Sequence, residues 1–204
     1  MRCAVLCFGN ELHGDDGFGI AVGQQLAQHP LPPPWELHLV GTRGLDALAL
    51  LQGCRQAVLV DAQMADGVPG RLHWRDAVAT REALEAPAAS VHTAGIDALL
   101  GSLRCLEAAA SGSGTQARAS GAASRPEAGE AEPAMPPRNA QVSLLTVEMD
   151  QCRPFHMALS STVAGSVDTA VAALLAFMHS GQAPAHGPAW AQLFPRGEVD
   201  VTTA

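Results

Sequence analysis

The sequence predicts an α/β protein, a three-layer α/β/α sandwich built on a mostly parallel sheet. Two short runs, Cys3–Phe8 and Ala57–Ala62, are almost entirely apolar, which is typical of strands that helices cover on both faces. Strand-like and helix-like segments also alternate along the chain. This alternation indicates βαβ units, in which consecutive strands run parallel.

Five segments are expected to form strands: Cys3–Phe8, Glu36–Val40, Ala57–Ala62, Arg71–Asp76 and Val142–Met149. Among these, Arg71–Asp76 alternates polar and apolar residues, as a half-exposed edge strand does. Four segments are expected to form helices: Gly17–His29, Gly44–Gln52, Thr93–Glu107 and Ser160–His179. A proline-rich stretch follows the first helix, and a glycine follows the second and the last. These residues are typical of helix C-termini, so they predict where these three helices end.

Length and composition predict one domain with an insertion and a tail. The chain has 204 residues, of which 48% are hydrophobic, enough for a single core over residues 1–181. Residues 108–140 are rich in Ala, Gly, Ser, Pro and Glu and have almost no large apolar side chain, so we expect a disordered insertion. Residues 182–204 contain several prolines and are expected to form a loosely held C-terminal tail.

Charge and cysteine content exclude several classes of partner. The formal net charge is −8, lysine is absent and no dense arginine cluster occurs, so neither nucleic acid nor an anionic membrane is expected as a partner. No apolar run approaches the ~20 residues of a membrane span. Five cysteines without a CxxC pair fit reduced thiols, and the first residues do not resemble a signal peptide. We therefore expect a cytoplasmic protein.

Polar residues gather where the predicted strands end. They are Asp15 and Asp16 after the first strand, Thr42 and Arg43 after the second, Asp61 at the end of the third, and Glu148 and Asp150 at the end of the last. In open α/β sheets ligands bind at the carboxyl ends of the strands, where these loops converge. His92, directly before a helix-like segment, can reach the same edge. The sequence therefore predicts a functional site there.

Three interpretations of this edge compete. A phosphate-binding P-loop needs a lysine after its glycines, and the chain has none. A phospho-acceptor receiver domain carries an acidic pair and a third-strand aspartate, which Asp15, Asp16 and Asp61 match, but it also uses a lysine. The third interpretation is a cation site of carboxylates and one imidazole. Two ionised carboxylates about 4 Å apart repel by ~4 kcal/mol at an effective dielectric of 20, so their convergence favours a cation.

Each of these residues also has a purely structural interpretation. Asp15 or Asp16 could stabilise the dipole of the following helix, and Asp61 or His92 could cap a turn or a helix. The remaining histidines show no metal-ligand spacing and are expected at the surface, with His156 nearest the last acidic loop. The cysteines have no base beside them in the sequence and are expected to be buried thiols.

Four motifs in order resemble the endopeptidases that mature nickel-iron hydrogenases. They are GNELHGDDGFG (residues 9–19), GTRG (41–44), VLVDA (58–62) and SVHTAGIDALL (90–100). The resemblance extends over about residues 2–106 and 142–178 and omits the insertion and the tail. It implies a five-stranded, phosphorylase/hydrolase-like α/β/α fold.

The resemblance also implies a function. Such enzymes remove a C-terminal extension from the hydrogenase large-subunit precursor after nickel has been inserted, and their metal-binding residues correspond here to Asp16, Asp61 and His92. Many relatives have Glu where this chain has the shorter Asp16. The implied metal is nickel, expected to arrive with the precursor, and the enzyme is expected to act as a monomer. The alternative is a non-catalytic receiver-like or metal-sensing signalling module.

Overall fold

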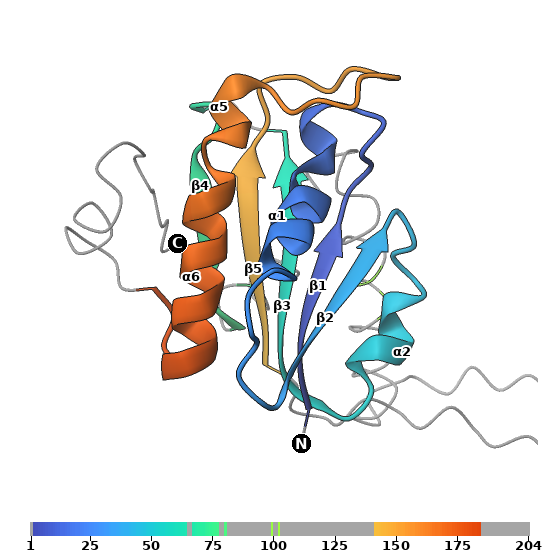
Figure 1. Ribbon diagram of the computed structural model, residues 1–204. Coiled ribbons are helices and arrows are strands. Elements are labelled where there is room, and N and C mark those ends of the chain that lie inside the picture. Colours follow the sequence, from blue (N-terminus) through green and yellow to red (C-terminus); the bar gives the residue numbers. More distant parts are fainter. Residues whose placement is uncertain are drawn as a thin grey trace, which may run out of the picture.

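The computed structural model describes residues 2–64, 67–77, 80, 99, 102 and 141–184. They form a five-stranded sheet with the strand order β2-β1-β3-β5-β4 (Figure 1). The strands are β1 (Arg2–Phe8), β2 (Trp35–Gly41), β3 (Cys54–Gln63), β4 (Leu72–Arg75) and β5 (Gln141–Glu148). Neighbouring strands are parallel from β2 to β5, and β4 pairs with β5 in the antiparallel direction. The predicted mostly parallel sheet with β4 at its edge is confirmed.

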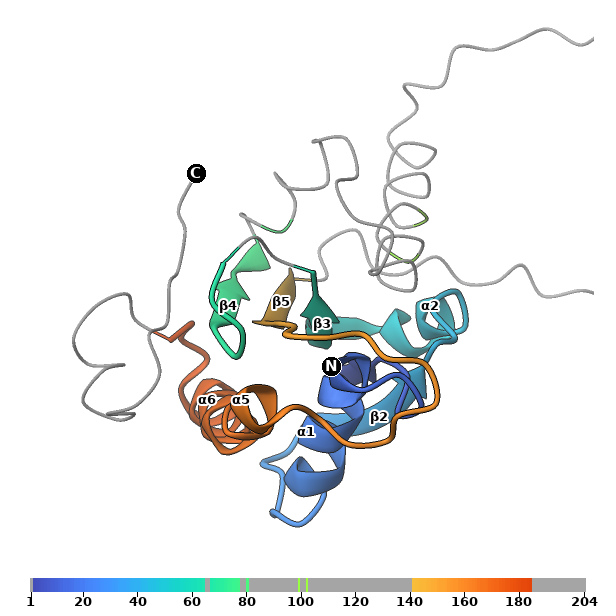
Figure 2. The ribbon, with the colours of Figure 1, turned by 90° about the horizontal axis from the view of Figure 1, so that it is seen from above.

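Helices cover both faces of this sheet. The helical elements are η1 (Asp15–Gly17), α1 (Phe18–Leu26), α2 (Ala47–Leu51), α5 (Ser161–Ala164) and α6 (Val167–Ser180). Seen from above, α1, α5 and α6 lie on one face of the sheet and α2 lies on the other (Figure 2). The three-layer α/β/α sandwich is therefore confirmed.

Alternating strand residues build one hydrophobic core on each face. In β1, Cys3, Val5 and Cys7 face the core shared with α1 and α6, where Trp74 packs on Phe177 with ring centroids 4.9 Å apart. Residues of β1 with the opposite orientation join the α2 core, together with Leu51 and Leu99: Ala4, Leu6 and Phe8. This double burial is why β1 and β3 read as continuous apolar runs.

The segment predicted as one helix, Ser160–His179, forms two. The first, α5, ends at Ala164, and Gly165 and Ser166 stand between it and α6. The Ser166 hydroxyl donates to the carbonyl oxygen of Gly70 at 2.6 Å, in the turn before β4. This contact joins residues 96 positions apart, so it cannot be foreseen from local periodicity.

The stretch Ser161–Ser180 corrects a second expectation. An 18-residue window of this 20-residue stretch has a mean hydropathy of 1.5, so by length and composition the stretch could cross a membrane, although the sequence suggested no such run. In this fold α6 is a core helix, because Val171, Leu174 and Phe177 are buried against the sheet and α1. Core helices have the same hydropathy as membrane spans, and the packing explains it here.

Several predictions lie outside the described residues. They concern the helix expected at Thr93–Glu107, the insertion at residues 108–140 and most of the tail, residues 185–204. These stay predictions, as does the division into a domain of residues 1–181 and a tail.

Candidate functional site

The loop after β1 folds tightly around Gly9. Gly9 has φ 118°, a backbone conformation that glycine adopts easily. A Cβ atom at this position would lie 2.0 Å from the carbonyl oxygen of Asp16 and 3.8 Å from Oδ1 of Asp61. The glycine thus allows the backbone carbonyl group of Asp16, in η1, to pack against this loop, with the Asp61 side chain of β3 nearby.

Backbone contacts hold Asp16 in this position. The Asn10 N–H donates to both the carbonyl oxygen and the Oδ2 atom of Asp16, each at 3.1 Å. A few residues further on, a Cβ on Gly19 would lie 2.2 Å from the Phe8 carbonyl oxygen and 2.6 Å from that of Val60. The start of α1 therefore rests directly on the ends of β1 and β3. The glycines of the motif make this close packing possible.

Asp61 presents a buried carboxylate at the end of the sheet. The residue is only 4% exposed, and its Oδ1 accepts a hydrogen bond from the Ala62 N–H at 2.9 Å. Its neighbours in β3, Val60 and Ala62, face the α1 and α6 core, so Asp61 faces the opposite side. The backbone carbonyl group of Asp16 and the Oδ1 atom of Asp61 both lie near Gly9, and the pairing of the two carboxylates stays a prediction.

Asp15 has a different task from Asp16. Its buried carboxylate accepts four hydrogen bonds, from the N–H groups of Asp150, Gln151 and Ser160 and from the Ser160 hydroxyl, at 2.6 to 3.0 Å. These donors belong to the loop that follows β5. Asp15 therefore ties the loop after β1 to the loop after β5, and the structural interpretation holds for this residue of the pair.

His92 lies outside the described residues, so its place relative to Asp16 and Asp61 stays a prediction. Within the described part of the chain, no three His, Cys, Asp or Glu side chains form a group that could hold a metal ion. The described residues thus contribute two carboxylates, and a third ligand would have to come from elsewhere in the chain or from the substrate.

A second polar group lies on the same face of the sheet as Asp61. Strand register places Asp61 beside Thr146, and Thr146 beside His73. The His73 side chain is largely buried, and its Nε2 lies 2.7 Å from Oε1 of Glu148. The expectation that His73 lies at the surface is wrong. Its alternation with Leu72 and Trp74, which face the α6 core, places His73 on the opposite face of the sheet but does not predict that Glu148 covers it there.

The Glu148 carboxylate is packed against the turn before β4. Its Oε2 atom is buried without a hydrogen-bond partner in the described structure. A Cβ on Gly67 would lie 2.3 Å from this oxygen, so a larger residue there would displace the Glu148 carboxylate. Glu148, which the sequence placed among the site residues, is thus buried beside His73 rather than presented to solvent.

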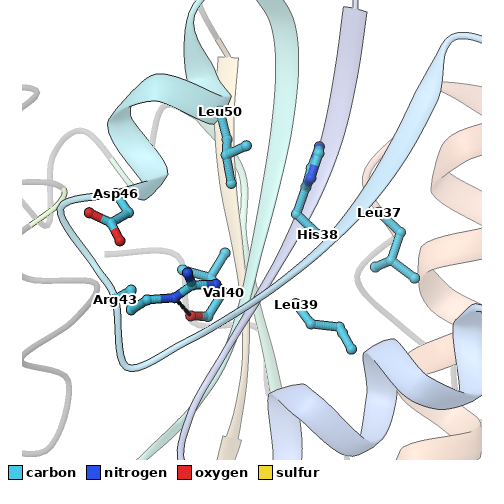
Figure 3. A pocket seen from close by; sticks show the side chains of 7 residues that line it. All are labelled: Leu37, His38, Leu39, Val40, Arg43, Asp46 and Leu50. Atoms are coloured by element: carbon cyan, nitrogen blue, oxygen red, sulfur yellow. Dashed lines mark hydrogen bonds between the residues drawn. The ribbon is translucent and has the colours of Figure 1, made fainter.

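The candidates in the loop after β2 face another part of the molecule. Arg43 and Asp46 line a cavity of about 370 Å³ between β2 and α2 (Figure 3). The Arg43 side chain turns back on its own loop, with its Nε donating to the Val40 carbonyl oxygen at 3.4 Å. Neither Asp16 nor Asp61 lines this cavity.

The cysteines of the described structure are free thiols with suppressed reactivity. Cys3, Cys7 and Cys54 are buried and Cys152 is partly buried. Burial, with a smaller effect of the Asp61 charge, raises the pKa of Cys7 to about 12. Burial, with the charges of Asp16 and Asp15, also raises the pKa of Cys152, the thiol in the loop after β5. A raised pKa leaves little thiolate, so neither thiol suits a nucleophile at neutral pH.

We expect Cys7 to resist alkylation in the folded protein. At pH 7.5 a thiol of pKa about 12 is ionised to less than about one part in ten thousand, and only the thiolate reacts. Iodoacetamide treatment followed by peptide mass mapping should find Cys7 unmodified in buffer and fully modified in 6 M urea. Rapid labelling of Cys7 in native buffer would show that the thiol is accessible and ionised.

The strand order separates this fold from a receiver domain. Receiver-type sheets have the order 2-1-3-4-5. Here β5 takes the fourth place, and β4 is antiparallel at the edge. The Asp15 carboxylate is also occupied by four hydrogen bonds to the loop after β5. Both observations disfavour the signalling interpretation.

Comparison with solved structures identifies proteins of the same architecture. No protein-family model matches the sequence, and no curated protein matches it. Among solved structures, the hydrogenase maturating endopeptidase HybD from E. coli is 21% identical, with a TM-score of 0.65 over 89% of this chain and 94% of that one. The [NiFe] hydrogenase maturation protease HybD from Thermococcus kodakarensis is 24% identical, with a TM-score of 0.58 over 84% of this chain and 95% of that one.

A third similar structure is the hydrogenase 2 maturation peptidase from a Thaumarchaeota archaeon, which is 23% identical with a TM-score of 0.54 over 86% of this chain and 97% of that one. The three proteins come from a bacterium and two archaea, and each is matched over nearly its whole length. The chain therefore has the fold of the hydrogenase maturation endopeptidases.

Proposed function

We propose that this chain is an endopeptidase that removes the C-terminal extension from the large-subunit precursor of a nickel-iron hydrogenase. The observation that carries the proposal is a fold shared with hydrogenase maturation endopeptidases, in which the loop around Gly9 lies against the backbone of Asp16 and beside Oδ1 of Asp61. The motif of residues 9–19 supplies both the tight turn and Asp16.

The donor set proposed for this site fits a cation. Asp16 follows β1 and Asp61 lies in the neighbouring strand β3, at the carboxyl ends where ligands bind in open sheets, and two carboxylates that meet there are stabilised by a positive charge. A metal ion bound there would polarise the scissile carbonyl and lower the pKa of a water molecule. Asp16 and Asp61 would hold it, and His92 is proposed as the imidazole ligand on the resemblance.

We propose that nickel enters this site as part of the substrate. Two carboxylates and one imidazole make a weaker site than the three or four supported ligands of a lasting metal site. If the precursor supplies the remaining ligands, the set is complete only in the complex. Binding then depends on whether the precursor has been loaded, which is a source of specificity. The reduced cysteines agree with a cytoplasmic enzyme, which we propose acts as a monomer.

Cleavage is therefore expected to require nickel in the precursor. Enzyme that has been treated with chelator and desalted should cleave the nickel-loaded precursor and leave the nickel-free precursor intact, as followed by gel electrophoresis. The purified enzyme should contain well under one metal ion per chain. Equal cleavage of the two precursor forms, or activity restored only by zinc added to the enzyme, would contradict the shared-metal proposal.

A further inference from the structure

Three exposed apolar side chains stand close to the candidate site. Phe155 is 91% exposed, Met157 75% and Leu12 48%. We call these three residues the apolar ridge. Phe155 and Met157 lie in the loop after β5, and Leu12 lies in the loop after β1. Exposed apolar groups that gather on one surface mark interaction sites more often than scattered ones do.

The backbone joins the two loops at this ridge. His13 and His156 form a parallel bridge, the His156 N–H donates to the Leu12 carbonyl oxygen at 3.1 Å, and the Gly14 N–H donates to that of His156. Leu12 and Phe155 each precede the bridged histidines by one residue, so the register places them side by side. The ridge is one surface made from two loops.

Packing within the chain does not explain the conformation of Phe155. It is the one non-glycine residue with positive φ, 61°, in the described part of the chain. Side chains with a Cβ atom rarely adopt this region, because the Cβ crowds the backbone. The ring is also almost fully exposed, so no burial compensates for the conformation. An aromatic side chain held outward in this way suits an anchor for a partner.

The ridge is fixed relative to Asp16. Asp15, the neighbour of Asp16, binds the loop after β5 through Asp150, Gln151 and Ser160, on both sides of Phe155 and Met157 in the sequence. A polypeptide whose scissile bond lies at Asp16 must also cover the surface that adjoins this residue. The ridge belongs to that surface.

Charges around the ridge indicate the chemistry of the partner. Glu11 and Asp150, which flank the ridge in the sequence, are exposed and acidic, whereas Arg153 is exposed and basic. The rim is therefore net negative. A partner surface with an apolar centre and a basic margin fits both features.

We propose that the apolar ridge is the surface on which this enzyme holds an apolar, basic-flanked segment of the hydrogenase large-subunit precursor during cleavage. This inference rests on the proposed function and adds a binding surface to it. The ridge acts in binding and places the precursor, whereas Asp16 and Asp61 act on the peptide bond.

Serine substitutions test the ridge. Phe155→Ser and Met157→Ser should each raise KM for the nickel-loaded precursor about tenfold, with the loss of kcat/KM carried by KM, because each removes an apolar anchor. Leu45→Ser is the matched control, since Leu45 is 59% exposed but lies before α2, outside the ridge. The control should keep the wild-type KM. Circular dichroism melting curves should confirm that all three variants are folded.

The possible outcomes separate the two proposals. Wild-type KM values for Phe155→Ser and Met157→Ser, with normal cleavage, would overturn the ridge proposal and leave the proposed function standing. A wild-type dimer in sedimentation velocity that the ridge variants convert to monomer would assign the ridge to a second copy of this chain and overturn the proposal as well. A folded wild-type enzyme that neither binds nor cleaves the precursor would refute the proposed function itself.

Discussion

Asp61→Asn is expected to lower the rate of precursor cleavage by about 10³-fold, within the range typical of groups that act in the reaction. The buried Asp61 carboxylate would lose its charge but keep an oxygen that accepts the Ala62 N–H, so its described hydrogen bond survives. Asp16→Asn should have a similar effect, because the Asn10 N–H would likewise keep its acceptor. His92→Ala should also nearly abolish cleavage. The effect of each of the three substitutions is measured as the cleavage rate at a saturating concentration of nickel-loaded precursor.

Asp46→Asn is the matched control for these variants. Asp46 is an exposed carboxylate directly before α2, and its side chain makes no capping hydrogen bond to that helix. It should cleave at close to the wild-type rate. Removing charge from a repulsive cluster need not destabilise the fold, so the melting temperatures of Asp16→Asn and Asp61→Asn should stay near the wild-type value. Near-normal cleavage by a folded variant would remove that residue from the site.

Asp15→Ala is expected to lower the free energy of unfolding by about 3–5 kcal/mol, because four donors lose a charged acceptor and three of them are backbone N–H groups. For a chain of this size such a loss corresponds to a decrease in melting temperature of roughly 6–20 °C. Urea titration of the wild-type protein and of Asp15→Ala measures the free energy of unfolding, and thermal melting of both measures the melting temperature.

Substitutions of the adjacent residues Asp15 and Asp16 are thus expected to affect different properties, stability for Asp15 and catalysis for Asp16. Asp15→Ala should change stability strongly, and the activity that remains at low temperature should be limited by the disturbed loop. Asp16→Asn should change activity strongly and stability little. If Asp15→Ala melts at the wild-type temperature, the four hydrogen bonds do not stabilise the fold and our assignment of Asp15 is incorrect.

Local sequence patterns predicted most of this fold. The apolar runs of β1 and β3 reflect burial on both faces, and the alternation around Leu72–Arg75 reflects an edge strand. The hydrogen bond from Ser166 to Gly70, at the break between α5 and α6, could not be predicted, because only the packed structure brings these two residues together. The antiparallel pairing of β4 with β5 is equally a property of the folded sheet.

The positions of the site residues along the chain could be predicted from the sequence where a single loop or strand end contains them. The motif around Gly9 places Asp16 after β1, and Asp61 lies near the end of β3, so general rules for open sheets predict both at one edge of the sheet. Sequence alone could not tell that Asp15 binds the loop after β5, since its partners lie 135 to 145 residues away. The contact between His73 and Glu148 was missed for the same reason, because it spans 75 residues.

The mass of the precursor before and after incubation with this enzyme tests the central claim most directly. Purified wild-type protein should convert nickel-loaded large-subunit precursor into one shorter chain and one released C-terminal peptide, both identified by intact-mass spectrometry. Asp61→Asn should leave the precursor mass unchanged in the same experiment. An unchanged mass with folded wild-type enzyme, or cleavage that proceeds equally with Asp61→Asn, would contradict the assignment of this chain as the processing endopeptidase.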